Sequence, residues 1–278
     1  VQTGSTSENP GGVGKDESSA KFTLEDTKMN FAVTKNSVYG IAFNCKDAFL
    51  SNENLRKALV MLTKTEGIET PHQAIDTAKG IIPEACRYAN SSYRQAAGNL
   101  TVPKYDEAAA LELWNNGLKE LEKESATVKI ICPQEYLGII QGIIQNWQRV
   151  LSTSIIAKVE AVSAETLKDS VRNGKYQLAV TEITASSSTA FDMLKIFTTE
   201  NSKNIFGYSS PEFDGLLEKI IRTSAGAVIL TDIKKAEQML LDSAVFLPLH
   251  NHGDYFVFSS EAENIYASPV FESICFIS

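Results

Sequence analysis

The sequence lacks a long hydrophobic run. Its longest apolar stretch, from Leu137 to Ile144, is interrupted by Gly and Gln, whereas a membrane-spanning helix needs about 20 predominantly apolar residues. The chain also has no initiator Met, no signal peptide and no lipidation cysteine near Val1, where it begins in polar sequence. We therefore expect any export signal to lie upstream of the given sequence.

Positive charge is also in short supply. The 278 residues contain 34 acidic and 26 basic side chains, for a net charge of -8, and no dense run of Lys or Arg occurs in the sequence. Binding to a phosphate backbone requires clustered Lys and Arg, and an anionic membrane surface attracts polybasic segments. The composition therefore argues against a nucleic-acid partner and against an anionic membrane surface.

Motifs for catalysis and for cofactors are missing as well. The segment nearest to a GxSxG nucleophile motif runs from Gly207 through Ser209 to Pro211, and it has Pro211 where the motif has its second Gly. The segment GGVG, from Gly11 to Gly14, precedes Lys15 but does not fit a phosphate-binding loop, because Asn9 and Asp16 stand where the motif needs Gly and Ser or Thr, and no strand pattern precedes it. No residue pattern supports a catalytic centre, so we predict that the protein is not an enzyme and has no cofactor.

Histidine and cysteine are too few and too scattered to indicate a metal site. His250 and His252 form an HxH pair whose rings point to the same face of a strand. A metal needs further ligands, and His72 is the only other His, so we interpret the pair as a polar strand end. The cysteines form no CxxC pair and are expected to be free thiols: Cys45, Cys86, Cys132 and Cys275.

The apolar content, 43% of the residues, is sufficient for one large domain or two small ones. Residues 1–20 are rich in Gly, Ser and Pro and have few apolar side chains, so they cannot bury enough surface to fold alone. We expect residues 1–36 to be a largely irregular loop or crossover segment, and residues 37–278 to form one α/β lobe.

Hydrophobic periodicity within residues 37–278 alternates between strands and helices. Strands are predicted at 38–43, 128–132, 155–161, 176–181, 245–250 and 254–258. Helices are predicted after Asn52, at 72–79, after Asp106, at about 137–151, around Leu167 and Val171 with an end at Gly174, after Ser210 and at 229–243. The helix after Asp106 is expected to place Leu111, Trp114, Leu118 and Leu121 on one apolar face. The strand–helix–strand–helix–strand order predicts an α/β layer with some parallel pairing and right-handed crossovers.

Four segments, in order, resemble one family. They are YGIAFNCKDAFLSNENLRKAL from Tyr39, YDEAAALELW from Tyr105, NGKYQLAV from Asn173, and NIFGYSSPEFDGLLEKI from Asn204 together with AEQMLLDSAVFLPLH from Ala236. The chain is identified as a member of bacterial extracellular solute-binding protein family 5, the oligopeptide- and dipeptide-binding proteins of ABC importers. The resemblance implies a periplasmic-binding-protein-like (type II) lobe with a mixed β-sheet flanked by helices.

The resemblance also implies what surrounds this lobe. Family members are longer, with two lobes that close on a ligand by hinge motion, and the four segments belong to the C-terminal lobe. The implied partners are the missing N-terminal lobe of the same protein, the ABC permease subunits, and a peptide or other small solute. The implied location is the extracellular face of the bacterial membrane or the periplasm, with a lipid anchor in the full-length protein.

Two stretches are expected by resemblance to face the cleft between the lobes. The first is the strand with Tyr39 and Asn44. The second follows Thr181, and its expected ligand-binding residues are Glu182, Ile183, Thr184, Ser186 and Ser187. Family members have a Trp and an Asp in the second stretch, and the Asp holds the peptide amine. Both are missing here, so either Glu182 takes that role through a charge-assisted bond or Glu182 is a solvated strand end.

The expected function is therefore capture of oligopeptides in an interlobe cleft for delivery to the permease. Because the second stretch departs from the family pattern, two alternatives stay open. The same scaffold binds a non-peptide solute, such as a sugar, a modified peptide or a metal chelate. Alternatively, the protein is a surface sensing or adhesion protein without transport.

Overall fold

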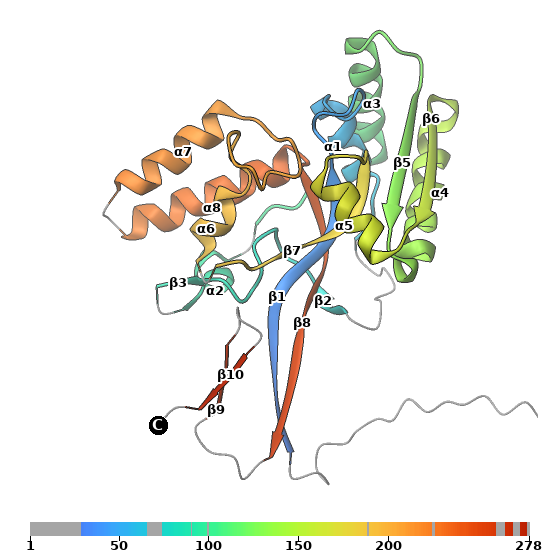
Figure 1. Cartoon of the computed structure of the whole chain (residues 1–278). Helices are drawn as coiled ribbons and strands as arrows, with labels where there is room; N and C mark the ends of the chain where they lie inside the picture. The colour runs from blue at the N-terminus through green and yellow to red at the C-terminus, as the bar shows by residue number, and fades with distance from the viewer. Residues whose placement is uncertain are drawn as a thin grey trace, which may run out of the picture.

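A six-stranded mixed sheet is the centre of the fold (Figure 1). The computed structural model describes residues 29–65, 74–89, 91–98, 100–187, 189–223, 226–259, 265–268 and 273–276. In spatial order the strands of the sheet are β2 (Ala74–Thr77), β8 (Phe246–Ser259), β1 (Met29–Phe43), β7 (Leu178–Thr184), β5 (Ala126–Cys132) and β6 (Ile155–Ala161). Two small hairpins pair β3 (Arg87–Tyr88) with β4 (Ser91–Ser92) and β9 (Ile265–Ser268) with β10 (Ser273–Phe276).

The direction of the strands confirms the predicted α/β class. β5 is parallel to both β6 and β7, and helices connect these strands, as parallel pairing requires. β1 is antiparallel to β7 on one side and to β8 on the other, and β2 is antiparallel to β8. The sheet is therefore parallel at one edge and antiparallel through its centre.

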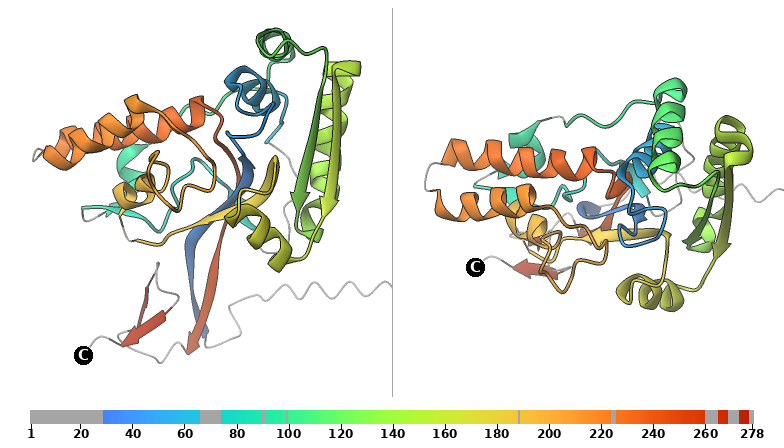
Figure 2. Two further views of the ribbon diagram at one scale, coloured as in Figure 1. Left: turned by 45° about the horizontal axis from the view of Figure 1, so that its top comes forward. Right: turned by 90° about the horizontal axis from the view of Figure 1, so that it is seen from above.

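Helices cover both faces of the sheet. α7 and α8 lie on one side, and α3 and α4 lie on the other (Figure 2). The first face packs against α2 (Tyr93–Ala97), α5 (Ala164–Arg172), α6 (Ala190–Lys195), α7 (Pro211–Arg222) and α8 (Gly226–Asp242). The second face packs against α1 (Glu53–Met61), α3 (Glu107–Glu120) and α4 (Leu137–Leu151).

Alternation along β1 divides the core into two halves. Val38 and Ala42 pack in the half under α6, α7 and α8. Ile41 and Phe43 pack in the other half, which also contains the two fully buried tryptophans of α3 and α4. Because successive side chains of a strand point to opposite faces, the parity of a residue on β1 determines which core it joins.

Several local signals are confirmed by the structure. The side chains of Asn52, Asp106 and Ser210 each accept a hydrogen bond from a backbone N–H in the first turn of α1, α3 and α7. Pro211 is the first residue of α7. Gly174 follows α5 with a positive φ of 63°. Cys45, Cys86 and Cys132 are free thiols as expected.

Other expectations were wrong. Ala74–Thr77, within the predicted helix at 72–79, forms β2, because it pairs with β8. The two closing strands are the single strand β8. Leu111 is exposed, and Ala110 is buried in its place. β1 begins at Met29, so residues 29–36 are strand, not irregular chain. Residues 1–28 lie outside the described part of the chain, so the crossover proposed for residues 1–36 is otherwise untested.

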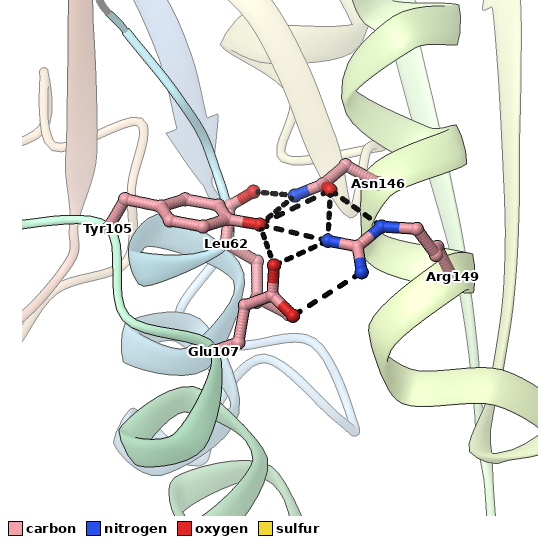
Figure 3. A network of polar contacts seen from close by, with 5 residues as sticks. All are labelled: Leu62, Tyr105, Glu107, Asn146 and Arg149. Atoms are coloured by element: carbon pink, nitrogen blue, oxygen red, sulfur yellow. Dashed lines mark hydrogen bonds and ion pairs between the residues drawn. The ribbon is translucent and has the colours of Figure 1, made fainter.

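A polar network joins α1, α3 and α4 at the surface (Figure 3). Arg149 of α4 donates to Glu107 Oε1 over 2.5 Å, and the Tyr105 hydroxyl donates to the same oxygen over 2.6 Å. Asn146 donates to the backbone oxygen of Leu62, just after α1, over 2.7 Å. The hydrogen bonds from Arg149 and Tyr105 lower the pKa of Glu107 to about 2, and the Arg149 bond is the main cause. Glu107, at the start of α3, therefore connects α3 to α4.

The strands β1 and β8 continue together well past the helical layers (Figure 1). Their pairing runs from Ala42 opposite Phe246 to Met29 opposite Ser259, with register shifts near Thr34 and Tyr39. Within the described residues, no helix is long and apolar enough to cross a membrane.

Candidate ligand-binding site

The candidate site lies where the parallel strands end. β5 ends at Cys132 and β7 ends at Thr184 on the same edge, because the two strands are parallel. Ligands of open α/β sheets bind outside the carboxyl ends of such strands. The middle of β1 and of β8 passes beside this edge, so the site combines residues from four strands and from the turn after β5.

Two cross-strand rows bring the site residues together. Tyr39 of β1 lies opposite Glu182 of β7 and opposite His250 of β8. Two residues earlier, Ser37 lies opposite Thr184 and His252. Residues directly opposite one another, and residues two apart on a strand, share a face of the sheet. The sheet thus presents the six side chains of these rows on one face, next to the core half that contains the tryptophans.

An aromatic cluster forms the base of the site. The ring of Tyr39 stacks on Tyr136 with a centroid distance of 5.6 Å and on His252 with a centroid distance of 4.2 Å. The hydroxyl of Tyr136 and Nε2 of His252 form a hydrogen bond of 3.1 Å. Tyr136 is fully buried and Tyr39 is only partly buried. The buried pair therefore fixes the orientation of the Tyr39 ring, whose remaining surface lines the site.

The charge state of this cluster is set by burial. Burial, together with the nearby carboxylates of Glu182 and Glu135, raises the pKa of Tyr39 to about 12, and burial is the main cause. Burial and the neighbouring His250 lower the pKa of His252 to about 4. Burial alone lowers the pKa of His250. The phenol and both imidazoles are therefore neutral at neutral pH, and the charges of the site come from carboxylates and from the cations of α5.

Two pockets open onto this surface, and both are lined by Tyr39, Glu182 and Thr184. The smaller, of about 290 Å³, extends over β8 to His252 and Asp254. The larger, of about 600 Å³, extends toward α5 and is lined there by Leu167, Val171, Lys168 and Arg172. An extended ligand that spans both pockets would contact carboxylates at one end and cations at the other.

The structure brings together three of the seven predicted site residues: Tyr39, Glu182 and Thr184. Ile183 lies between Glu182 and Thr184 on β7 and therefore points to the opposite face, where only 4% of it is exposed. The strand before the second predicted stretch was expected to end at Thr181. β7 instead continues to Thr184, so the first residues of this stretch belong to the strand.

Asn44 does not join the site either. Its side-chain amide donates to the backbone oxygens of Tyr176 over 2.7 Å and Gly174 over 3.2 Å. Its side-chain oxygen accepts a hydrogen bond from the backbone N–H of Lys46. Asn44 is buried and lies past the end of β1, at the opposite end of β7. Its bonds hold the turn before β7, so its role is structural.

The two predicted serines lie beyond β7, at the start of α6. Ser187 donates to Asp192 over 2.9 Å, and Ser186 contacts the sulfur of Met193 at 3.9 Å. Neither serine lines the two pockets. The contacts indicate that these residues shape the entry into α6.

Tyr136, His252 and Asp254 belong to the site but were not predicted. The sequence offered a basis for predicting Tyr136. This residue lies in the turn that begins at Pro133, just after a strand of the α/β pattern, and such turns lie at the edge of the sheet where ligands bind. The HxH pair was correctly placed on one face, since both rings contact Tyr136. The interpretation as a strand end was wrong, because both histidines are buried within β8.

The described residues contain no group of three His, Cys, Asp or Glu side chains able to hold a metal ion. Comparison with known proteins then decides the family. Residues 13–204 match the model of bacterial extracellular solute-binding proteins, family 5, Middle. The chain belongs to this family. The family expected from the sequence segments is thereby confirmed.

A curated relative and several solved structures of this solute-binding family are similar to the chain. Dipeptide-binding protein DppE of Bacillus subtilis (strain 168) is 22% identical over an aligned length of 258 residues, and the match covers 89% of this chain and 46% of DppE. Listeria monocytogenes OppA bound to peptide superposes with a TM-score of 0.71 at 20% identity, over 91% of this chain and 50% of OppA. The substrate-binding domain of an oligopeptide ABC transporter from Bacillus anthracis str. Ames gives a TM-score of 0.72 at 14% identity, over 91% and 51% of the two chains.

The chain thus spans about half the length of these relatives. The structural likenesses establish the solute-binding fold, with the mixed sheet and its two helical layers. The residues of the site are this chain's own, and at this level of identity their roles have to be argued from their geometry.

Proposed function

We propose that this chain is the C-terminal lobe of the substrate-binding component of an ABC importer, which captures oligopeptides in an interlobe cleft and delivers them to the permease. Membership of solute-binding family 5 supports this proposal. The relatives named above are dipeptide- and oligopeptide-binding proteins by their descriptions. Relatives of this kind are binding proteins, and we propose likewise that the chain has no catalytic activity.

The observation that carries the proposal is the shared pocket surface around Tyr39, Glu182 and Thr184. It lies at the strand edge from which β1 and β8 extend past the helical layers (Figure 1). Two strands that leave a lobe side by side suit a connection to a second lobe. A second lobe attached there would stand over the pockets and close them.

Each residue of this surface has a proposed role toward a peptide. The carboxylate of Glu182 binds an ammonium group, because a charge-assisted hydrogen bond is the strongest polar contact available here. The face of Tyr39 packs against a side chain. The hydroxyls of Ser37 and Thr184 bind backbone groups, and such contacts select for a peptide main chain but for no particular sequence.

The test is binding by the intact two-lobed protein. Calorimetry and thermal-shift assays against a mixed library of short peptides should give heat and a rise in the melting temperature, because a ligand that binds only the folded state stabilises it. Absence of both signals across the library would eliminate the peptide proposal. Hydrolysis of peptide or ester substrates by the purified chain would contradict its proposed role as a binding protein only.

We also propose that the full-length protein is exported to the extracellular face of the membrane or the periplasm and carries a lipid anchor. The family description, which names extracellular proteins, supports the exported location. Metabolic labelling of the full-length protein with a fatty acid would test the anchor, and lack of label on the exported protein would refute it.

A further inference from the structure

A basic pocket of about 540 Å³ lies apart from the candidate ligand-binding site. It is formed by β1, the loop before β3, and α2, and Figure 1 shows the segment with β3 and α2 beside β1. Four basic side chains line it, namely Lys35, Lys79, Arg87 and Arg94. Glu84 is the one acidic side chain among the described residues of the lining. Such a concentration of cations is unusual in a chain whose net charge is -8.

Two of these cations are held in place by carboxylates. Lys35 Nζ lies 2.5 Å from Asp76 and 3.1 Å from Glu84. Arg94 Nη2 lies 2.7 Å from Glu237 and 3.0 Å from the backbone oxygen of Ile82. These contacts fix the charged ends, so a bound group would not have to order them. Lys79 is exposed and makes no ion pair with any other described residue.

The guanidinium of Arg94 has N–H donors that are not used in hydrogen bonds. Arg94 is only 9% exposed, and its Nη1 has no hydrogen-bond partner among the residues that the structure describes. A buried donor without a partner is uncommon in proteins, and an acceptor from a bound group or from an ordered water would satisfy it. The planar fork of an arginine suits the paired oxygens of a phosphate or a carboxylate.

We propose that this pocket is an oxyanion-binding site, in which Lys79 and Arg94 bind the oxygens of a phosphate or carboxylate group. Lys79 supplies a mobile charge at the rim, Arg94 supplies a fixed one at the base, and Ser92 and Gln95 supply further polar groups in the lining. The site shares no lining residue with the two pockets around Tyr39. It therefore does not depend on the function proposed for those pockets.

The experiment is calorimetric titration of the purified chain with inorganic phosphate, at constant ionic strength maintained with chloride. We expect saturable binding to one site. The Lys79→Met variant should bind phosphate about tenfold more weakly, the loss expected when one charge-assisted contact is removed. A parallel titration with malonate distinguishes the two oxyanions: tighter binding of malonate supports the site and assigns it to carboxylates.

The matched control is Lys158→Met, which removes another exposed positive charge, from β6. This variant should bind phosphate as the unmodified chain does. Circular dichroism checks that both variants are folded. Absence of saturable binding of either anion, or equal weakening by the two substitutions, would overturn the proposal.

Discussion

At the scale of single residues, charge selection in the candidate site depends on Glu182, which lies between the two pockets and opposite Tyr39. In the intact protein we expect Glu182→Gln to weaken binding of peptides with a free amine about tenfold. Hydrogen bonds to charged groups contribute about 1.5–3 kcal/mol, and about 1.4 kcal/mol corresponds to tenfold in affinity. Calorimetry with matched free and N-acetylated peptides measures the effect.

The control for this prediction is Glu124→Gln, an exposed acidic residue before the start of β5, at the far end of the strand from the site. It should leave both affinities unchanged. An equal loss for free and acetylated peptides in Glu182→Gln would contradict the role in amine binding.

A second residue-scale prediction concerns the buried ion pair between Arg94 of α2 and Glu237 of α8. Glu237 is fully buried, and its carboxylate also accepts hydrogen bonds from Tyr93 and from the backbone N–H groups of Ile81 and Ile82. Glu237→Ala should lower the free energy of unfolding by about 3–5 kcal/mol, because it leaves a buried cation unpaired.

Urea denaturation of the chain measures this change. The comparison is Glu218→Ala, which breaks the exposed pair between Glu218 and Arg222 and should cost about 0–1 kcal/mol. A cost below about 1 kcal/mol for Glu237→Ala would show that the buried pair does not hold α2 and α8 together.

At the scale of secondary-structure elements, the close approach of β1 and β8 depends on Gly40. A Cβ atom at this position would lie 2.6 Å from the ring of Phe246 and closer still to the backbone oxygen of Leu247. Gly40→Ala should therefore force the two strands apart, and we expect a loss of stability of at least about 1–3 kcal/mol, typical of overpacking. Thermal unfolding followed by circular dichroism is the measurement.

Gly142→Ala provides the opposite case in the interior of α4. A Cβ atom there has no neighbour within 4 Å, and Ala is favoured over Gly in a helix by about 0.5–1 kcal/mol. The substitution should raise the melting temperature. Destabilisation of similar size by both alanine substitutions would refute the packing argument for Gly40.

The network around Glu107 makes a prediction about pH. Its folded-state pKa, about 2, lies below the ordinary glutamate value. The stabilisation from Glu107 is therefore complete above the unfolded-state pKa and is lost as the pH falls toward 2. The stability difference between the chain and its Glu107→Gln variant should be constant from pH 6 to 7 and shrink below about pH 4.5. A pH-independent difference in denaturation midpoints would contradict this.

At this scale the helix ends could be predicted, because a cap depends only on neighbouring residues. Ser210, Pro211 and Glu212 specify the start of α7 whatever the rest of the chain does. β2 could not be predicted, because Ala74–Thr77 is a strand only through its pairing with β8. That partner lies far away in the sequence, and its pairing overrides the local helical pattern.

The candidate site could be predicted only in part, because some of its residues belong to recognisable sequence segments and others come together only on folding. Tyr39 and Glu182 were found through the resemblance of their strands to a family pattern. Ile183 was included by treating 182–187 as a loop, whereas the alternation of β7 turns Ile183 away. Tyr136 and His252 meet only after folding, so no local pattern joins them.

At the scale of the whole molecule, the proposed function makes the chain one wall of a cleft between two lobes. Hinge closure of two lobes around a ligand requires both walls. We expect the 278-residue chain alone to bind peptides at least about 100-fold more weakly than the intact protein, since most contacts of a closed cleft would be lost. Parallel calorimetry of the two proteins measures the ratio, and equal affinities would show that this lobe binds the ligand by itself.

The central pairing of the sheet also has a consequence for synthesis and folding. Asn36 and Asp254 are hydrogen bonded although 218 positions separate them in the sequence. β1 therefore cannot pair with β8 until nearly the whole lobe has been synthesised. The unit of β5, β6 and β7 is local by comparison and can assemble earlier. We therefore expect the pairing of β8 with β1 and β2 to be the slow, last step of folding. A chain that ends before Phe246 would leave both sides of β2 and one side of β1 unpaired, and such unpaired strand edges favour aggregation.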